Sequence, residues 1–200
     1  MSMIKQFLTA AAILVAAPAF AAAVVGQPAP AISGTDSMGR TQSLASFKGK
    51  TVVVEWTNPE CPFVQKFYGG GDMQKLQAQA RKQGVVWLTI NSGAPGKQGS
   101  ISAAEANAKM KAQGSAASAY ILDASGDIGQ AFGARTTPHM FVIDPSGTVV
   151  FAGGIDDRPT ADPADISGAR NNVTAALADL QAGKPVQVAT SRPYGCSVKY

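Results

Sequence analysis

The hydrophobic pattern alternates short apolar runs with stretches of helical spacing. Two runs, Thr51 to Trp56 and Val85 to Ile90, are rich in β-branched residues and nearly all apolar, which is typical of strands buried on both faces. Met140 to Ile143 and Thr148 to Phe151 flank the turn sequence Asp144-Pro-Ser-Gly147. This arrangement predicts an antiparallel hairpin.

Segments with helical start and stop signals fill the intervals between these runs. The remaining expected elements are a helical turn at Leu44 to Phe47, helices over Pro62 to Tyr68, Asp72 to Gly84, Ser102 to Gly114 and Asp127 to Phe132, a strand at Tyr120 to Leu122, and a last helix that carries Ile166, Ala169, Val173, Leu177 and Leu180 on one face. Parallel strands need helical crossovers, whereas a hairpin adds antiparallel strands at the edge. The pattern therefore predicts one α/β domain with a mixed central sheet and helices on both faces.

The first residues have the composition of a secretory signal peptide. Lys5 precedes an apolar run from Phe7 to Ala17, and small residues follow Pro18, as in segments that are removed after export. We expect residues 1–21 to be removed, with cleavage after Ala21 or two residues later; an uncleaved anchor is the alternative. The apolar run is shorter than the roughly 20 residues that span a bilayer. The mature protein is thus expected to be periplasmic or secreted, and not to be held in a membrane.

Beyond the predicted leader, residues 24–183 are expected to form the domain and residues 184–200 a C-terminal tail. The formal net charge of +4 is spread over a sequence without a run of like charges, which argues against a nucleic-acid partner. The chain has two cysteines, Cys61 and Cys196. Two are too few for a disulfide-stapled scaffold, but an exported protein reaches a compartment in which a pair can be oxidised.

Cys61 stands where a buried strand runs out into a loop, immediately before Pro62. Proline is favoured at the first helical position, so Cys61 falls at or beside the N-cap. The free N–H groups and the positive end of the helix dipole favour a thiolate there, which lowers the pKa of the cysteine and activates it as a nucleophile. The alternative is an inert cysteine that packs as a small hydrophobic residue.

Several short motifs follow one another along the chain. They are Gly26-Gln-Pro-Ala-Pro30, the run 51–56, Cys61-Pro-Phe-Val64, Trp87-Leu-Thr-Ile-Asn91, Thr137-Pro138, Ile143-Asp-Pro-Ser-Gly147 and Gly195-Cys-Ser197. In this order they resemble the thioredoxin-like redoxins of the alkyl hydroperoxide reductase/thiol-specific antioxidant superfamily, and most of all its peroxiredoxin-like branch. The resemblance covers nearly all of the mature chain. It implies a thioredoxin-like fold and an antioxidant or thiol-exchange activity at Cys61.

The sequence departs from that family pattern at three positions. Val64 stands where thioredoxins have the second cysteine of Cys-x-x-Cys. Asn58 stands where many members of the branch have a cysteine, and where peroxidases of the peroxiredoxin type have Thr or Ser. Pro138 takes the place of the arginine that those peroxidases set beside the nucleophile to stabilise the leaving oxygen. The departures weigh against efficient peroxidase chemistry, and both disulfide and peroxide substrates stay open.

The resemblance also implies roles for residues outside this motif. Thr137-Pro138 resembles the cis-proline loop, which faces the reactive cysteine and offers backbone groups to an extended peptide or another thiol substrate. Glu55 lies at the offset of the thioredoxin carboxylate that moves protons behind the cysteine; a polar residue at a strand end is the alternative. His139, the only histidine, is expected near the same loop as a proton-exchanging group or as an ordinary loop residue.

Cys196 is a candidate partner for Cys61. Val64 removes the nearby resolving thiol, the chain has no third cysteine, and the tail contains Pro185, Pro193 and Gly195 with little periodicity, so it can fold back over the domain. A redox-active disulfide and a purely structural one both fit these facts, because closing a long loop stabilises a fold by up to roughly 5 kcal/mol in the chain-entropy model.

These observations favour an exported thiol oxidoreductase. Its Cys61 thiolate would attack a protein or small-molecule disulfide, or a peroxide, and Cys196 or an external thiol reductant would resolve the product without a cofactor. A thioredoxin-fold binding module that has lost turnover is the alternative. Metal delivery by Cys61, His139 and Cys196 is a third reading, but the residues lack the spacing of a metal site, so no metal is expected.

Overall fold

The computed structural model describes residues 22–200, so the predicted signal peptide lies outside the described residues. Its central sheet contains the five strands β3 (Val52–Trp56), β4 (Val86–Asn91), β5 (Ala119–Leu122), β7 (His139–Ile143) and β8 (Val149–Gly153), in the order β5-β4-β3-β7-β8. Strands β3, β4 and β5 are parallel, whereas β7 is antiparallel to β3 and β8 to β7. The predicted mixed sheet is confirmed, with strand β3, which precedes Cys61 in the chain, at its centre.

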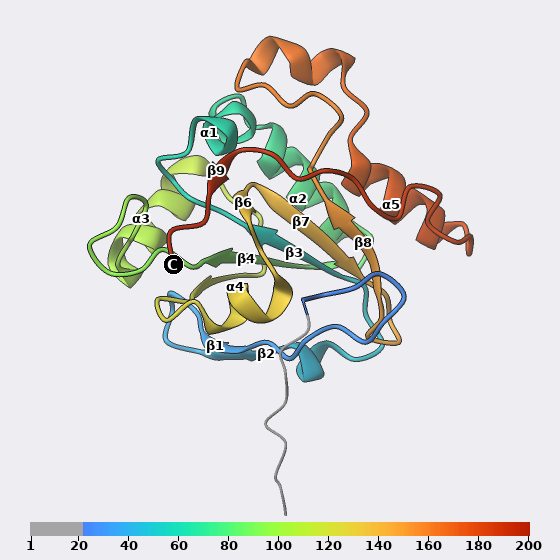
Figure 1. The fold of residues 1–200 in the computed structure, drawn as a ribbon, viewed down its shortest axis with the longest axis horizontal. Coiled ribbons are helices and arrows are strands. Elements are labelled where there is room, and N and C mark those ends of the chain that lie inside the picture. Colours follow the sequence, from blue (N-terminus) through green and yellow to red (C-terminus); the bar gives the residue numbers. More distant parts are fainter. Residues whose placement is uncertain (1–21) are drawn as a thin grey trace, which may run out of the picture.

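The remaining elements connect or cover this sheet. The helices are η1 (Leu44–Phe47), α1 (Pro62–Gly69), α2 (Asp72–Lys82), α3 (Ala103–Gln113), α4 (Asp127–Phe132), η2 (Pro163–Gly168) and α5 (Asn172–Gln181), and the short strands are β1 (Ser33–Thr35), β2 (Thr41–Ser43), β6 (Thr136–Thr137) and β9 (Cys196–Ser197). The capping box that the sequence predicts at Ser102 and Glu105 is present at the start of α3. Figure 1 shows the sheet in the middle of the molecule with these elements around it.

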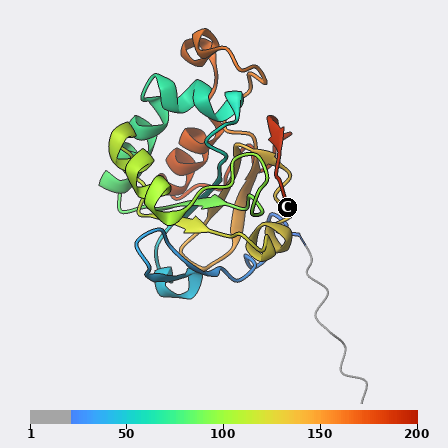
Figure 2. The ribbon, with the colours of Figure 1, turned by 90° about the vertical axis from the view of Figure 1, so that its left-hand side faces the viewer.

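The sheet separates two hydrophobic clusters. On one face, apolar residues of α1, α2 and α5 pack against Val53, Trp87, Met140 and Phe151. On the other face, residues of α4, η1 and the segment before β1 pack against Trp56 and its neighbours. In Figure 2 the green helices α2 and α3 and the gold α4 lie on opposite sides of the sheet. The expected covering of both faces by helices is therefore confirmed.

Two details of the expected elements are wrong. The hairpin does not add two edge strands, because β7 lies between β3 and β8 and is buried throughout. The expected last helix is broken into η2 and α5, since Ala169 has an extended backbone. Asn171 then caps α5 by accepting a hydrogen bond from the Thr174 N–H, which is a preferred role of asparagine at a helix start.

The tail returns from α5 across the sheet edge to the centre of the molecule. It first runs beside β8, where Thr190 forms a bridge with Ala152, and it then forms β9, which pairs with β6 in antiparallel fashion. In Figure 1 the red tail crosses the front of β6 next to α1. Among residues 22–200, no helix has both the length and the apolar character needed to cross a membrane.

Candidate redox site

Cys61 occupies the N-cap of α1, as the sequence predicts. Its backbone is extended and Pro62 begins the helix, while the Cys61 carbonyl accepts hydrogen bonds from the N–H groups of Val64 and Gln65. Cys61 therefore lies at the N-terminal end of α1, where the helix dipole is positive. Unlike an open active-site cysteine, however, Cys61 is 0 % exposed, because the tail lies next to it.

The tail brings Cys196 to Cys61. Thr137 pairs with Cys196 in the β6–β9 ladder, and the Cys61 Sγ lies 3.1 Å from the Thr137 carbonyl oxygen. The two thiols lie close enough for each to shift the pKa of the other. Both thiols are free and no disulfide joins them in this structure; Cys61 is buried and Cys196 partly exposed. The two cysteines of the chain thus share one site, although 134 residues separate them in the sequence.

The environment shifts the pKa values of the two thiols in opposite directions. Burial acts to raise the pKa of Cys61, but hydrogen bonds from the Cys196 side chain, the Thr137 side chain and the backbone of Cys196 and Val64 outweigh it, so the pKa lies below its ordinary value. The Thr137 carbonyl accepts from the protonated thiol and opposes ionisation. For Cys196, burial and then the hydrogen bond and charge of Cys61 raise the pKa to about 11. Cys61 is therefore the more acidic thiol of the pair and Cys196 the less acidic one.

A buried ionic cluster anchors the tail before Cys196. Lys66, only 1 % exposed, lies in α1 and pairs with Asp156 at 3.2 Å, and its ammonium donates to the Arg158 carbonyl at 2.8 Å. The Tyr194 hydroxyl donates to the same Asp156 carboxylate. The Tyr194 ring also meets Phe63 edge-on, with the centroids 5.9 Å apart. None of these roles is visible in the sequence, because the paired residues are distant and Lys66 resembles a solvent-facing helix residue.

Further contacts hold the tail at and after Cys196. A Cβ atom on Gly195, whose φ is +124°, would collide with the Thr137 carbonyl, so glycine is needed for this close approach. Beyond Cys196, the Val198 N–H donates to the Arg135 carbonyl and the Tyr200 hydroxyl donates to the Ala134 carbonyl at 2.7 Å. The cysteine is therefore fixed from both sides.

Of the residues expected around the cis-proline loop, Thr137 is hydrogen-bonded to Cys61 and His139 is not. The Thr137-Pro138 peptide is cis, as predicted, and Thr137 contacts Cys61. His139 is buried, accepts a hydrogen bond from the Arg135 N–H at Nδ1 over 3.3 Å and packs on Phe141. Burial, followed by the charge of Arg135, lowers the pKa of His139 to about 4. Among the described hydrogen bonds none joins His139 to a cysteine, so the imidazole is neutral and part of the core.

Glu55 is a buried residue of β3, and its carboxylate accepts hydrogen bonds from four side chains. Its carboxylate accepts from the Tyr68 hydroxyl and the Trp87 indole, both at 2.8 Å, and from Thr89 and Gln77. Burial raises the pKa of Glu55 above its ordinary value, although these four donors oppose the rise. Within residues 22–200 no hydrogen bond connects Glu55 to Cys61, so the structure gives it no direct path to the thiol.

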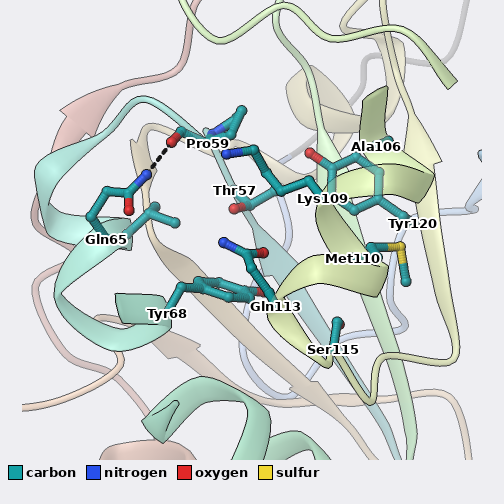
Figure 3. A pocket seen from close by; sticks show the side chains of 11 residues that line it. Thr57, Pro59, Gln65, Tyr68, Ala106, Lys109, Met110, Gln113, Ser115 and Tyr120 are labelled. Carbon is teal, nitrogen blue, oxygen red and sulfur yellow. Dashed lines mark hydrogen bonds between the residues drawn. The ribbon is translucent and has the colours of Figure 1, made fainter. Parts of the chain in front are cut away.

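A narrow cleft lies between α1 and α3, next to Tyr68 (Figure 3). Its volume of about 20 Å³ exceeds that of one water-sized probe only slightly, which is too small for an organic ligand. Three or more His, Cys, Asp or Glu side chains do not gather into a metal-binding group anywhere in the described part of the chain.

Comparisons with known proteins agree with this geometry. The sequence matches the Redoxin family over residues 24–173, whereas no curated protein matches the chain. An uncharacterized conserved protein from Geobacillus kaustophilus has 24 % identity and a TM-score of 0.77, with 88 % of this chain and 92 % of that chain covered. A hypothetical protein from Sinorhizobium meliloti has 26 % identity and a TM-score of 0.76, with 90 % and 96 % covered.

A more distant likeness identifies the fold. A secreted Mycobacterium tuberculosis disulfide oxidoreductase has 19 % identity and a TM-score of 0.52, with 68 % of this chain and 92 % of that chain covered. At this identity the likeness concerns the fold alone, and the central sheet with its cis-proline loop is thioredoxin-like. Because the family match spans most of the sequence, the chain belongs to the redoxin family.

Proposed function

We propose that this redoxin is an exported thiol oxidoreductase in which Cys61 is the nucleophile and Cys196 the resolving thiol. The observation that carries the proposal is that both cysteines contact Thr137: Cys196 pairs with it in the β6–β9 ladder, and the Cys61 Sγ lies 3.1 Å from its carbonyl oxygen. The pKa of Cys61 is lowered there and that of Cys196 is raised. A thiolate beside a protonated thiol is the arrangement that disulfide exchange needs. The predicted signal peptide supports export, since disulfide chemistry persists in compartments outside the cytosol.

The reaction has two steps. The Cys61 thiolate attacks one sulfur of a substrate disulfide, forms a mixed disulfide and releases the other sulfur as a thiolate. Cys196 then loses its proton and attacks the Cys61 sulfur, which forms the Cys61–Cys196 disulfide and releases the second substrate thiolate. The substrate is reduced by two electrons and the protein is oxidised by two, and an external thiol reductant restores the two thiols.

Disulfide substrates fit this site better than peroxides. Asn58, at the position where peroxidases have a hydroxyl, accepts from the Glu60 N–H at 2.8 Å and donates to the Gln98 carbonyl. Both polar atoms of the Asn58 side chain are therefore used in hydrogen bonds to the backbone. Pro138 carries no charge that could stabilise a leaving oxygen. With a peroxide the Cys61 sulfur would become a sulfenic acid, which Cys196 would condense with loss of water.

A turnover assay on wild type, Cys61→Ser and Cys196→Ser tests the proposal. With a disulfide substrate and a dithiol reductant, we expect Cys61→Ser to lose turnover, and Cys196→Ser to accumulate a mixed disulfide on Cys61. Equal rates in wild type and Cys61→Ser would contradict the proposal. Binding of a peptide without turnover, together with an ordinary Cys61 pKa of about 8.5, would instead favour the binding module.

A further inference from the structure

The substrate-docking edge of the cis-proline loop is already occupied. In the β6–β9 ladder, Thr136 pairs with Ser197 and Thr137 with Cys196. An extended peptide that adds to a sheet edge needs the backbone groups which this ladder uses. Cys61 beneath it is 0 % exposed, whereas Cys196 is partly exposed. An incoming thiol therefore meets the tail and its cysteine first.

A larger cleft borders the tail at this point. It has a volume of about 570 Å³ and is lined by Thr136, Asn172, Arg170, Arg192, Tyr194 and Gly195, among others. This volume is in the range of small-molecule sites. Gly195, the residue before Cys196, forms part of its wall, so the cleft opens next to the partly exposed cysteine.

The polar groups of the cleft indicate what it would bind. Arg170 and Arg192 supply positive charge, and Asp157 supplies negative charge. Arginine side chains bind carboxylates, and an aspartate can pair with a protonated amino group. The cleft thus matches a ligand that carries both a carboxylate and an ammonium group.

We infer that the external reductant is a small amino-acid-type thiol that binds in this cleft and attacks the Cys196 sulfur of the oxidised protein. The inference rests on the proposed Cys61–Cys196 disulfide. The first reductant thiolate forms a mixed disulfide with Cys196 and breaks the Cys61–Cys196 bond, so Cys61 leaves as a thiolate. A second reductant thiol then attacks the mixed disulfide, and the products are the reductant disulfide and the free Cys196 thiol. Two reductant molecules give one electron each.

The opposite pKa shifts of the two thiols support attack of the reductant at Cys196. A thiol with a lower pKa leaves faster in disulfide exchange, and the pKa of Cys61 is below its ordinary value whereas that of Cys196 is raised. Attack at Cys196 therefore expels the better leaving group. Attack at Cys61 would require the tail to detach first and would expel the poorer one.

Trapping the mixed disulfide tests which sulfur is attacked. Oxidised wild-type protein is mixed with excess glutathione, quenched with N-ethylmaleimide and digested with trypsin, which leaves the two cysteines on separate peptides. We expect glutathione on the Cys196 peptide and the alkyl group on the Cys61 peptide. Glutathione on Cys61 would overturn the inference and leave the proposed function intact. Failure of the oxidised protein to contain a Cys61–Cys196 disulfide would refute the proposed resolution itself.

A charge variant tests the cleft. We expect Arg192→Gln to slow reduction of the disulfide by glutathione about two- to fivefold, as for loss of one exposed ion pair. Reduction by cysteamine, a thiol without a carboxylate, should keep its wild-type rate. Arg81→Gln removes the same charge from α2, away from the cleft, and should change neither rate. Equal slowing of both thiols, or no slowing with glutathione, would contradict binding of the carboxylate by this cleft.

Discussion

The two cysteines lie side by side but are held in different ways. Cys61 is fixed by local structure, since a strand at the centre of the sheet ends just before it and Pro62 starts a helix just after it. Cys196 lies in a tail with a two-residue strand, and contacts on both sides of it determine its position. The helix start fixes the position of Cys61, whereas the lowered pKa of Cys61 and the availability of Cys196 both depend on the docked tail.

Because of this difference, we expect some substitutions to change mainly the stability of the domain and others mainly the reactivity of Cys61. The frame around Cys61 consists of strand β3 and the start of helix α1. Changes in this frame should destabilise the whole domain, because β3 lies at the centre of the sheet. Changes in the tail contacts should mainly alter how often Cys61 is uncovered. Asp156 contacts both regions, since it pairs with Lys66 of α1 and accepts from Tyr194 of the tail.

Asp156→Ala should have the largest effect, because Asp156 joins the tail to the core. The substitution leaves the buried Lys66 ammonium without its ion-pair partner and removes the acceptor for Tyr194. Breaking one side of a buried ion pair costs about 3 to 5 kcal/mol, and we expect a loss of that size in the free energy of unfolding by urea. The exposed neighbour Asp157 is the control, and Asp157→Ala should cost about 1 kcal/mol or less. Similar losses in both variants would contradict the cluster as an anchor.

Tyr194→Phe should have a smaller effect, and one confined to the tail. It removes a hydroxyl that donates to a charged acceptor, a contact worth about 1.5 to 3 kcal/mol. We expect faster alkylation of Cys61 by iodoacetamide, since the undocked tail exposes the sulfur, with far-UV circular dichroism unchanged.

The matched control for Tyr194 is Tyr200, whose hydroxyl donates to a neutral carbonyl at the other end of the tail. Tyr200→Phe removes a contact worth about 0.5 to 1.5 kcal/mol and should accelerate alkylation less. An unchanged alkylation rate in both variants would mean that tail opening does not control access to Cys61.

Glu55→Gln tests the frame around Cys61 through a pH dependence of stability, which we expect to be smaller than the losses above. The pKa of Glu55 is raised in the folded protein, so the unfolded chain releases this proton at a lower pH. The stability that the protonated carboxyl contributes is present below the unfolded pKa of about 4.3 and is lost as pH rises towards the folded value. Wild type should therefore lose stability relative to Glu55→Gln above about pH 4. A difference between the two proteins that does not vary with pH would contradict the raised pKa.

Local sequence signals predict most of the fold around Cys61. β-Branched runs, Pro62 after Cys61 and the capping box at Ser102 each act within a few residues, so the sheet strands, the N-cap position of Cys61 and α3 could be predicted. The break between η2 and α5 was missed, because Ile166 and Val173 keep helical spacing across it and the cap at Asn171 decides the boundary.

The candidate site was predictable only in part. The two cysteines and Thr137-Pro138 follow from residue type and family resemblance, and assignment to the peroxiredoxin-like branch stays a prediction. The Lys66–Asp156 pair was not predictable, because its members lie 90 residues apart and neither belongs to a motif. The collision that selects Gly195 likewise depends on the approach of the tail to Thr137, which no local pattern specifies.

The central claim is that Cys61 and Cys196 form a reversible redox pair on a folded domain. Its most direct test is to equilibrate the protein in glutathione buffers of increasing oxidation, and to measure the Cys61–Cys196 linked peptide by mass spectrometry and the fold by circular dichroism. We predict one two-electron transition between dithiol and disulfide with the fold retained in both states. Absence of the linked peptide at every ratio, or unfolding on reduction, would contradict the claim.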